Sequence, residues 1–253
     1  MVLRRIGLTM MGAALVAGAP PAAWAYRPFD GTDAAVADLH EVEVELQPAG
    51  VAHSPGQKTL IAPAFVYNYG FIKDWELVLE GQLETPLAPS GRSVLTESGA
   101  FLKHVVRQGT LQDQSGPSIA TEFGVLLPDT MGPGGTGASA ALIVSQRWDW
   151  GTVHFNAEAL WTRDQRAGTF TSVILEGPAK WTVRPVAEIS YEEAFGRTRT
   201  TAGLVGAIWQ VRDNLSFDVA LKHSVSNTGH ADELRAGLTF GFSASSLHQH
   251  HQP

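Results

Sequence analysis

This chain of 253 residues has 25 acidic and 18 basic residues, a formal net charge of −7, and no cysteine. The acidic balance argues against nucleic acid as a partner, because binding to phosphates needs a surplus of positive charge. The absence of cysteine excludes disulfide bonds and thiolate chemistry. A mean hydropathy of −0.02 fits either a water-soluble sheet or a membrane barrel.

The N-terminus has the three parts of a secretory signal peptide. Arg4 and Arg5 give a positive start, an apolar run follows, and Ala-Trp-Ala at 23–25 forms a small-residue cleavage site. We predict that residues 1–25 are removed, which leaves 16 basic against 25 acidic residues and a charge of −9. An uncleaved anchor is the alternative, but the apolar run is shorter than the roughly 20 residues of a spanning helix.

After the leader, residues 26–38 show no hydrophobic period, and we interpret them as an N-terminal arm. Alternation of apolar and polar residues then begins. Val42, Val44 and Leu46 share one parity, while three glutamates share the other. Successive side chains of a strand point to opposite faces, so this first strand would turn an apolar face to lipid and carboxylates to a water-filled lumen.

Eleven further runs follow, and several alternate as cleanly as the first. The runs span 59–69, 75–84, 95–107, 119–127, 138–148, 153–161, 170–181, 186–192, 200–209, 215–222 and 232–242. Turn-forming residues separate them, and the Gly- and Pro-rich segment 128–137 predicts a long loop that could narrow a lumen. Run 95–107 alternates less cleanly, because charged residues such as Lys103 share their parity with Phe101 and Val105, so its inward face has mixed contents.

About twelve strands therefore predict an all-β fold, an antiparallel up-and-down transmembrane β-barrel over residues 39–242, followed by a His-rich tail at 243–253. An even number of strands brings both ends of the barrel to the periplasmic side. A secreted soluble β-sandwich has the same period of two, and it stays open as an alternative.

Parts of the sequence resemble a known family. Arg27-Pro28-Phe29 with Asp33, the glutamate-rich first strand, the segment from Tyr69-Gly70 to Asp74-Trp75-Glu76-Leu77, Leu126-Leu127-Pro128 before a Gly-rich loop, and the closing run 234–242 are similar to the outer-membrane barrels labelled for a MetA pathway of phenol degradation. The chain departs from that family at Asp129-Thr130 and in the extension past Phe242. The resemblance implies a passive, transporter-like barrel for small, hydrophobic or aromatic molecules.

Charged residues on the inward parity are the candidate lumen lining. They are Glu41, Glu43, Glu45, Glu76, Glu80, Glu84, Glu122, Glu158 and Glu188, with Lys103, Arg107, Lys222 and Arg235. Carboxylates in an open pore would favour cations. The alternative is that these groups pair across the interior and fill a narrow barrel.

Two further clusters are candidate sites. His223 lies near Ser224 and Ser226, and a His beside a Ser can activate it for acyl hydrolysis. Neighbouring residues of a regular strand point to opposite faces, however, which separates His223 from Ser224. In the tail, His248, His250 and His251 could bind a transition metal, but no carboxylate or thiolate completes a site.

We therefore expect an exported protein of the Gram-negative outer membrane that acts as a channel for passive passage of small solutes. Its expected partners are outer-membrane lipid, a small-molecule solute and the barrel-assembly machinery. We expect no enzyme activity, catalytic residue, metal or cofactor. An acyl hydrolase using His223 and a Ser, and a structural barrel with a closed lumen, remain as alternatives.

Overall fold

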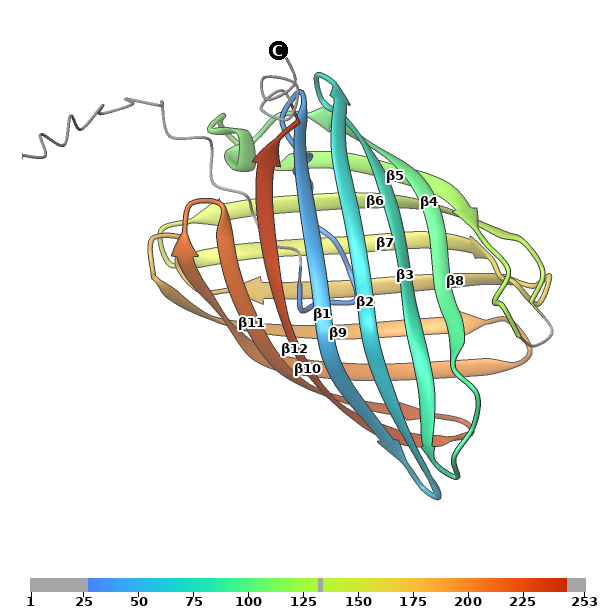
Figure 1. Ribbon diagram of the computed structural model, residues 1–253. Coiled ribbons are helices and arrows are strands. Elements are labelled where there is room, and N and C mark those ends of the chain that lie inside the picture. Colours follow the sequence, from blue (N-terminus) through green and yellow to red (C-terminus); the bar gives the residue numbers. More distant parts are fainter. Residues whose placement is uncertain (1–26, 132–133, 245–253) are drawn as a thin grey trace, which may run out of the picture.

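The computed structural model describes residues 27–131 and 134–244. They form one closed barrel of twelve antiparallel strands, in which each strand pairs with its sequence neighbours and β1 pairs with β12 (Figure 1). The expected all-β barrel is confirmed, and the sandwich alternative is wrong because a single sheet closes on itself. The predicted signal peptide and nearly all of the His-rich tail lie outside the described residues.

The strands have 9 to 16 residues, which meets the roughly 9–11 residues that a tilted strand needs to cross a bilayer. Their bounds are β1 Glu41–Ser54, β2 Gln57–Ile72, β3 Trp75–Ala88, β4 Val94–Arg107, β5 Ser118–Leu126, β6 Gly137–Trp148, β7 Gly151–Trp161, β8 Ala167–Glu176, β9 Val183–Ala194, β10 Thr198–Arg212, β11 Leu215–Ser226 and β12 Gly229–Ser243.

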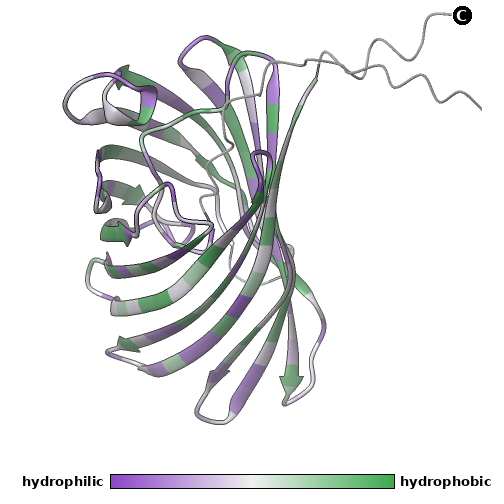
Figure 2. Ribbon diagram, turned by 90° about the vertical axis from the view of Figure 1, so that its left-hand side faces the viewer, coloured by the Kyte–Doolittle hydropathy of each residue, from purple (hydrophilic) through white to green (hydrophobic). Residues whose placement is uncertain are grey.

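The period of two decides which side chains face the lumen. Leu204, which is 2% exposed, pairs with Lys222, whereas the next residue, Val205, is 61% exposed. Hydrophobic and hydrophilic residues alternate along the strands in Figure 2. Large apolar side chains on the outer face are left exposed, among them Phe155, Ile189 and Leu221, and this is the surface that a hydrocarbon phase would cover.

Some strand boundaries differ from the sequence prediction. The run expected at 170–181 ends as a strand at Glu176, and Trp181 lies in the following turn with half its surface exposed. In contrast, β1 continues past the alternating segment to Ser54, because a register shift between Leu46 and Ala49 interrupts the period without ending the pairing.

Most connections have six residues or fewer, but the β4–β5 and β5–β6 connections, 108–117 and 127–136, are ten residues long. A single turn of 3₁₀ helix, η1 (Thr110–Gln112), lies between β4 and β5, and within 27–131 and 134–244 no helix is long and apolar enough to cross a membrane. The loop between β5 and β6 is held at the rim: Arg163 donates to the carbonyl oxygens of Leu127 and Ser98, and Thr130 bonds with Leu95.

The interior is occupied by the segment that precedes β1. We define residues Arg27 to Asp38 as the arm; the blue segment lies within the ring of strands in Figure 1. Its Ala34 is fully buried in a small apolar cluster with Ala120 and Ile143. The core of this barrel is therefore partly made by the chain's own N-terminal segment.

Candidate functional site

The arm runs around the inside of the barrel and bonds to eight of its strands. Its partners are Glu76 on β3, Lys103 on β4, Ser145 on β6, Asn156 on β7, Glu188 on β9, Asp218 and Lys222 on β11, Arg235 on β12, and Gln47 on β1. Polar groups buried away from water need partners, and here the wall and the arm supply them to each other.

Inward side chains of the wall accept hydrogen bonds from the arm's backbone. The distances are 2.7 Å from Asp30 N and 2.9 Å from Gly31 N to Glu188, 3.0 Å from Thr32 N to Asn156, 2.9 Å from Ala34 N to Ser145, and 2.7 Å from Ala37 N to Glu76. A chain without regular structure must find such acceptors when it is buried. The wall therefore fixes the backbone of the arm at five positions.

Gly31 is one of the positions where the arm closely approaches the wall. A Cβ atom there would lie 2.4 Å from Ser172 Oγ and 2.9 Å from Asn156 Nδ2. Both are side-chain atoms of residues on paired strands, so a Cβ at position 31 would require these side chains or the arm to shift. The lack of a side chain at this position lets the arm reach Glu188.

Ion pairs connect the arm's carboxylates to the basic residues of the wall. Asp30 lies 2.7 Å from Lys222 Nζ and 2.8 Å from Arg235 Nη2, and Asp33 lies 3.4 Å from Lys103 Nζ. Burial raises the pKa of Asp30, but the charges and hydrogen bonds of Lys222 and Arg235 outweigh it and hold that pKa at about 2. Asp30 is therefore ionised at neutral pH.

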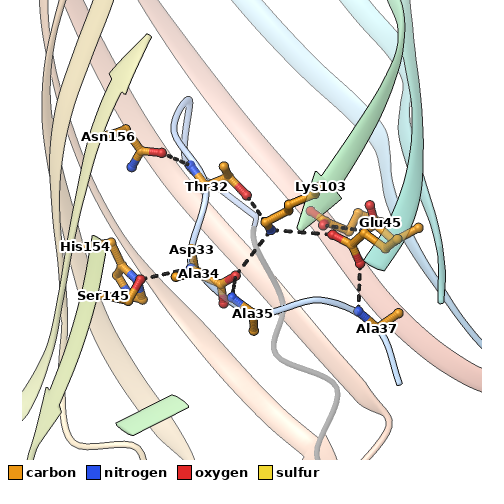
Figure 3. A network of polar contacts seen from close by, with 12 residues as sticks. Thr32, Asp33, Ala34, Ala35, Ala37, Glu45, Lys103, Ser145, His154 and Asn156 are labelled. Atoms are coloured by element: carbon orange, nitrogen blue, oxygen red, sulfur yellow. Dashed lines mark hydrogen bonds and ion pairs between the residues drawn. The ribbon is translucent and has the colours of Figure 1, made fainter. Parts of the chain in front are cut away.

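Figure 3 shows Lys103 pointing from the wall to Thr32 and Asp33, and Ser145 bonded to Ala34. Ser145 continues a chain of contacts into the wall. Its Oγ lies 2.8 Å from His154 Nδ1, and His154 Nε2 lies 3.1 Å from Glu176. This order resembles the hydrogen-bond chain of a serine hydrolase. Ser145 is fully buried beneath Ala34, so the three groups form a socket for the arm.

A cavity of about 620 Å³ lies beside the arm. It extends from Lys73 and Asp74 at the β2–β3 turn to Glu80 and Glu158 in the middle of their strands, and the arm forms one wall. Twelve acidic and three basic residues line it. Glu122 and Glu158 both pair with Ala141, so two carboxylates flank one small side chain of β6.

The predicted lining residues fall into three groups. Seven border the cavity: Glu41, Glu43, Glu45, Glu76, Glu80, Glu122 and Glu158, together with Lys103. Glu188, Lys222 and Arg235 bond to the arm. Two others lie apart: Glu84 accepts from Gln82 and Thr96, and Arg107 donates to the carbonyl oxygens of Ser115 and Pro117 in the β4–β5 loop.

The prediction that segment 128–137 narrows the lumen is wrong. None of the described residues of that loop borders the cavity, and Arg163 holds it at the rim. The arm occupies the lumen instead. Nothing in the sequence of residues 27–38 signals this, because their partners lie up to 207 positions away along the chain.

His223 and its neighbouring serine do not form a pair. His223 is exposed on the outer face and bonds Asp232 at 2.7 Å, whereas Ser224 donates to the carbonyl oxygen of Ala231. Within the described residues no group of three or more His, Cys, Asp or Glu side chains could hold a metal. The tail histidines His248, His250 and His251 lie outside those residues.

Four of the five exposed tryptophans among the described residues lie at the barrel end where β1 begins and β12 ends, and Trp161 lies at the other end. Trp148 and Trp150 stack at the β6–β7 turn, with ring centroids 5.3 Å apart, and both are exposed. Trp181 and Trp209 are exposed near the same end, and no tryptophan lines the cavity. A belt of this kind is typical of the membrane interface.

Solved structures share this fold at low sequence identity. An outer-membrane channel from Pseudomonas putida F1 has a TM-score of 0.60 at 9% identity, covering 82% of this chain and 97% of its own. The NanC porin has 0.59 at 7%, covering 79% and 98%, and the KdgM porin 0.52 at 10%, covering 79% and 99%. No family model and no curated protein matches the chain, so the narrower MetA-pathway likeness stays a prediction.

Proposed function

We propose that this chain is a channel of the Gram-negative outer membrane for passive passage of small solutes, exported by its leader and inserted by the barrel-assembly machinery. The observation that carries the proposal is a closed barrel with an apolar exterior and a polar, partly open interior. The fold shared with porins and an outer-membrane channel agrees with it. The proposal assigns no catalytic step.

The lining favours cations over anions. Twelve acidic residues against three basic ones leave the cavity strongly negative, and Lys103 already lies within 3.5 Å of both Asp33 and Glu76. Fixed carboxylates in a confined space raise the local concentration of cations. Passage of hydrophobic or aromatic solutes is a narrower proposal, supported by Phe29 and Phe170 in the lining.

Planar-bilayer recording of the mature protein tests the channel. Stepwise currents with a reversal potential of cation-selective sign in a potassium chloride gradient are expected. Replacing Glu80, Glu122 and Glu158 with Gln should lower the cation preference, whereas Asp149→Asn, in an exposed turn outside the cavity, should leave it unchanged. A folded, heat-modifiable barrel that passes no current would contradict the proposal and favour a structural barrel closed by its arm.

A further inference from the structure

Lys222 and Arg235 are two basic side chains of the wall that converge on a single carboxylate of the arm, Asp30. Lys222 Nζ and Arg235 Nη2 approach different oxygens of Asp30, at 2.7 Å and 2.8 Å. The two residues lie diagonally on neighbouring strands, since Lys222 pairs with Glu233 and Ala220 pairs with Arg235. Two cations placed around one carboxylate are a typical anion-binding arrangement.

The groups around this pair define what else the position recognises. Glu188 accepts both the Asp30 and Gly31 backbone N–H groups. Arg235 also donates to the carbonyl oxygen of Pro28 and to Glu233, which keeps its guanidinium in place. The position thus receives a carboxylate and, next to it, two hydrogen-bond donors.

Asp30, which occupies this position, belongs to the arm, and the arm pairs with no strand of the barrel. A segment that fills a site in the lumen can be displaced by a free solute with the same chemistry, because the wall groups satisfy either one. Acidic residues outnumber basic ones by twelve to three in the cavity lining, so a carboxylate site in the lumen would select among anions that the rest of the lining repels.

We propose that Lys222 and Arg235, with Glu188, form a lumen binding site for solutes that carry a carboxylate beside N–H or O–H donors, and that Asp30 occupies this site when no solute is bound. The role of this site rests on the proposed channel function, because a solute that enters the lumen would compete with the arm for Lys222 and Arg235. Occupation by a solute releases the arm and enlarges the open lumen.

The chain contains no cysteine, so one introduced thiol reports on the arm alone. Ala35 borders the cavity, and in Ala35→Cys a polyethylene-glycol maleimide reaches the thiol only when the arm leaves the lumen. The probe is N-acetyl-aspartyl-glycinamide, which reproduces the carboxylate and both N–H groups. Its matched control is N-acetyl-asparaginyl-glycinamide, which lacks only the charge.

The aspartyl probe should accelerate labelling of the folded mature protein, and the asparaginyl control should not. Asp30→Asn should raise the rate about tenfold without any probe, because the negative charge that attracts both Lys222 and Arg235 is lost. Lys222→Gln should remove the response to the probe, and Lys58→Gln, a charge removed at the exposed end of β2, should preserve it. Heat-modifiable mobility verifies that each variant is folded.

Equal labelling with the two probes, or an undiminished response in Lys222→Gln, would overturn the proposal. The readout does not depend on current through a bilayer. A barrel that passes no current but releases its arm to the aspartyl probe would contradict the channel and support the site. A conducting barrel with no such release would support the channel and contradict the site.

Discussion

At the scale of single residues, the contact between arm and wall depends on one missing side chain. Gly31→Ala would place a Cβ 2.4 Å from Ser172 Oγ and 3.1 Å from Glu188 Oε1, so the arm or these side chains must shift and the contact with Glu188 weakens. Overpacking of this kind costs about 1–3 kcal/mol. We expect faster thiol labelling of the arm in Gly31→Ala, and no change in Gly203→Ala, where a Cβ meets nothing within 4 Å. Equal rates in the two variants would contradict this role of Gly31.

Asp30 gives arm docking a defined dependence on pH. Its pKa falls from 3.8 in the free chain to about 2 in the barrel, so its ion pairs are fully formed above pH 3.8. A lowered carboxyl pKa means that this stabilisation is lost as the pH falls from 3.8 through 2. A nitroxide on Ala35→Cys should gain mobility over that range.

Other carboxylates titrate in the same range, so the control is a variant. In Asp30→Asn the nitroxide should already be mobile at pH 5, and the step between pH 4 and 2 should shrink. A wild-type profile that Asp30→Asn reproduces would show that other groups hold the arm.

At the scale of elements, the arm is separable from the sheet. Every strand of the barrel pairs with two neighbours, and β1 closes on β12 from Glu41 onward without help from the arm. Deletion of residues 27–37 should therefore leave a folded, heat-modifiable barrel. Its single-channel conductance should rise, because the segment that bonds to eight strands across the lumen is gone. An unchanged conductance would mean that the current avoids the space that the arm occupies.

The strands could be predicted from the sequence because their signal is local. Alternation in 232–242 or 153–161 needs only the residues of one strand, and the structure has β12 and β7 there. The sequence predicts a run that continues to Trp181, yet the strand ends at Glu176 and Trp181 lies exposed in the turn 177–182. Boundaries of this kind depend on neighbouring strands, which one segment does not encode.

The arm could not be placed from the sequence for a different reason. The arm shows no hydrophobic period, and its docking depends on ion pairs of Asp30 with Lys222 and Arg235, which lie 192 and 205 positions later in the chain. The inward parity of Lys222 and Arg235 follows from alternation, but their common partner does not. Long-range pairing of single side chains is specified only by the closed barrel.

At the scale of the whole molecule, the cost of a charge on the apolar outer face depends on whether that face contacts water or lipid. Val205 lies at the middle of β10 and is 61% exposed, with its side chain pointing away from the lumen. In a bilayer, Val205→Arg places a charge near the midplane, where an arginine costs about 2–4 kcal/mol. Val225→Arg, near the end of β11, should cost about 0–1 kcal/mol because its charge reaches the interface.

Urea titration of folding into lipid vesicles measures both free energies. A soluble barrel would have water at both positions, and two exposed Val→Arg changes would then cost the same small amount. The depth-dependent difference is a property of the bilayer, because it arises from desolvating a charge far from the headgroups. Equal losses of folding free energy for Val205→Arg and Val225→Arg would therefore contradict a lipid-facing outer surface, whatever the lumen conducts.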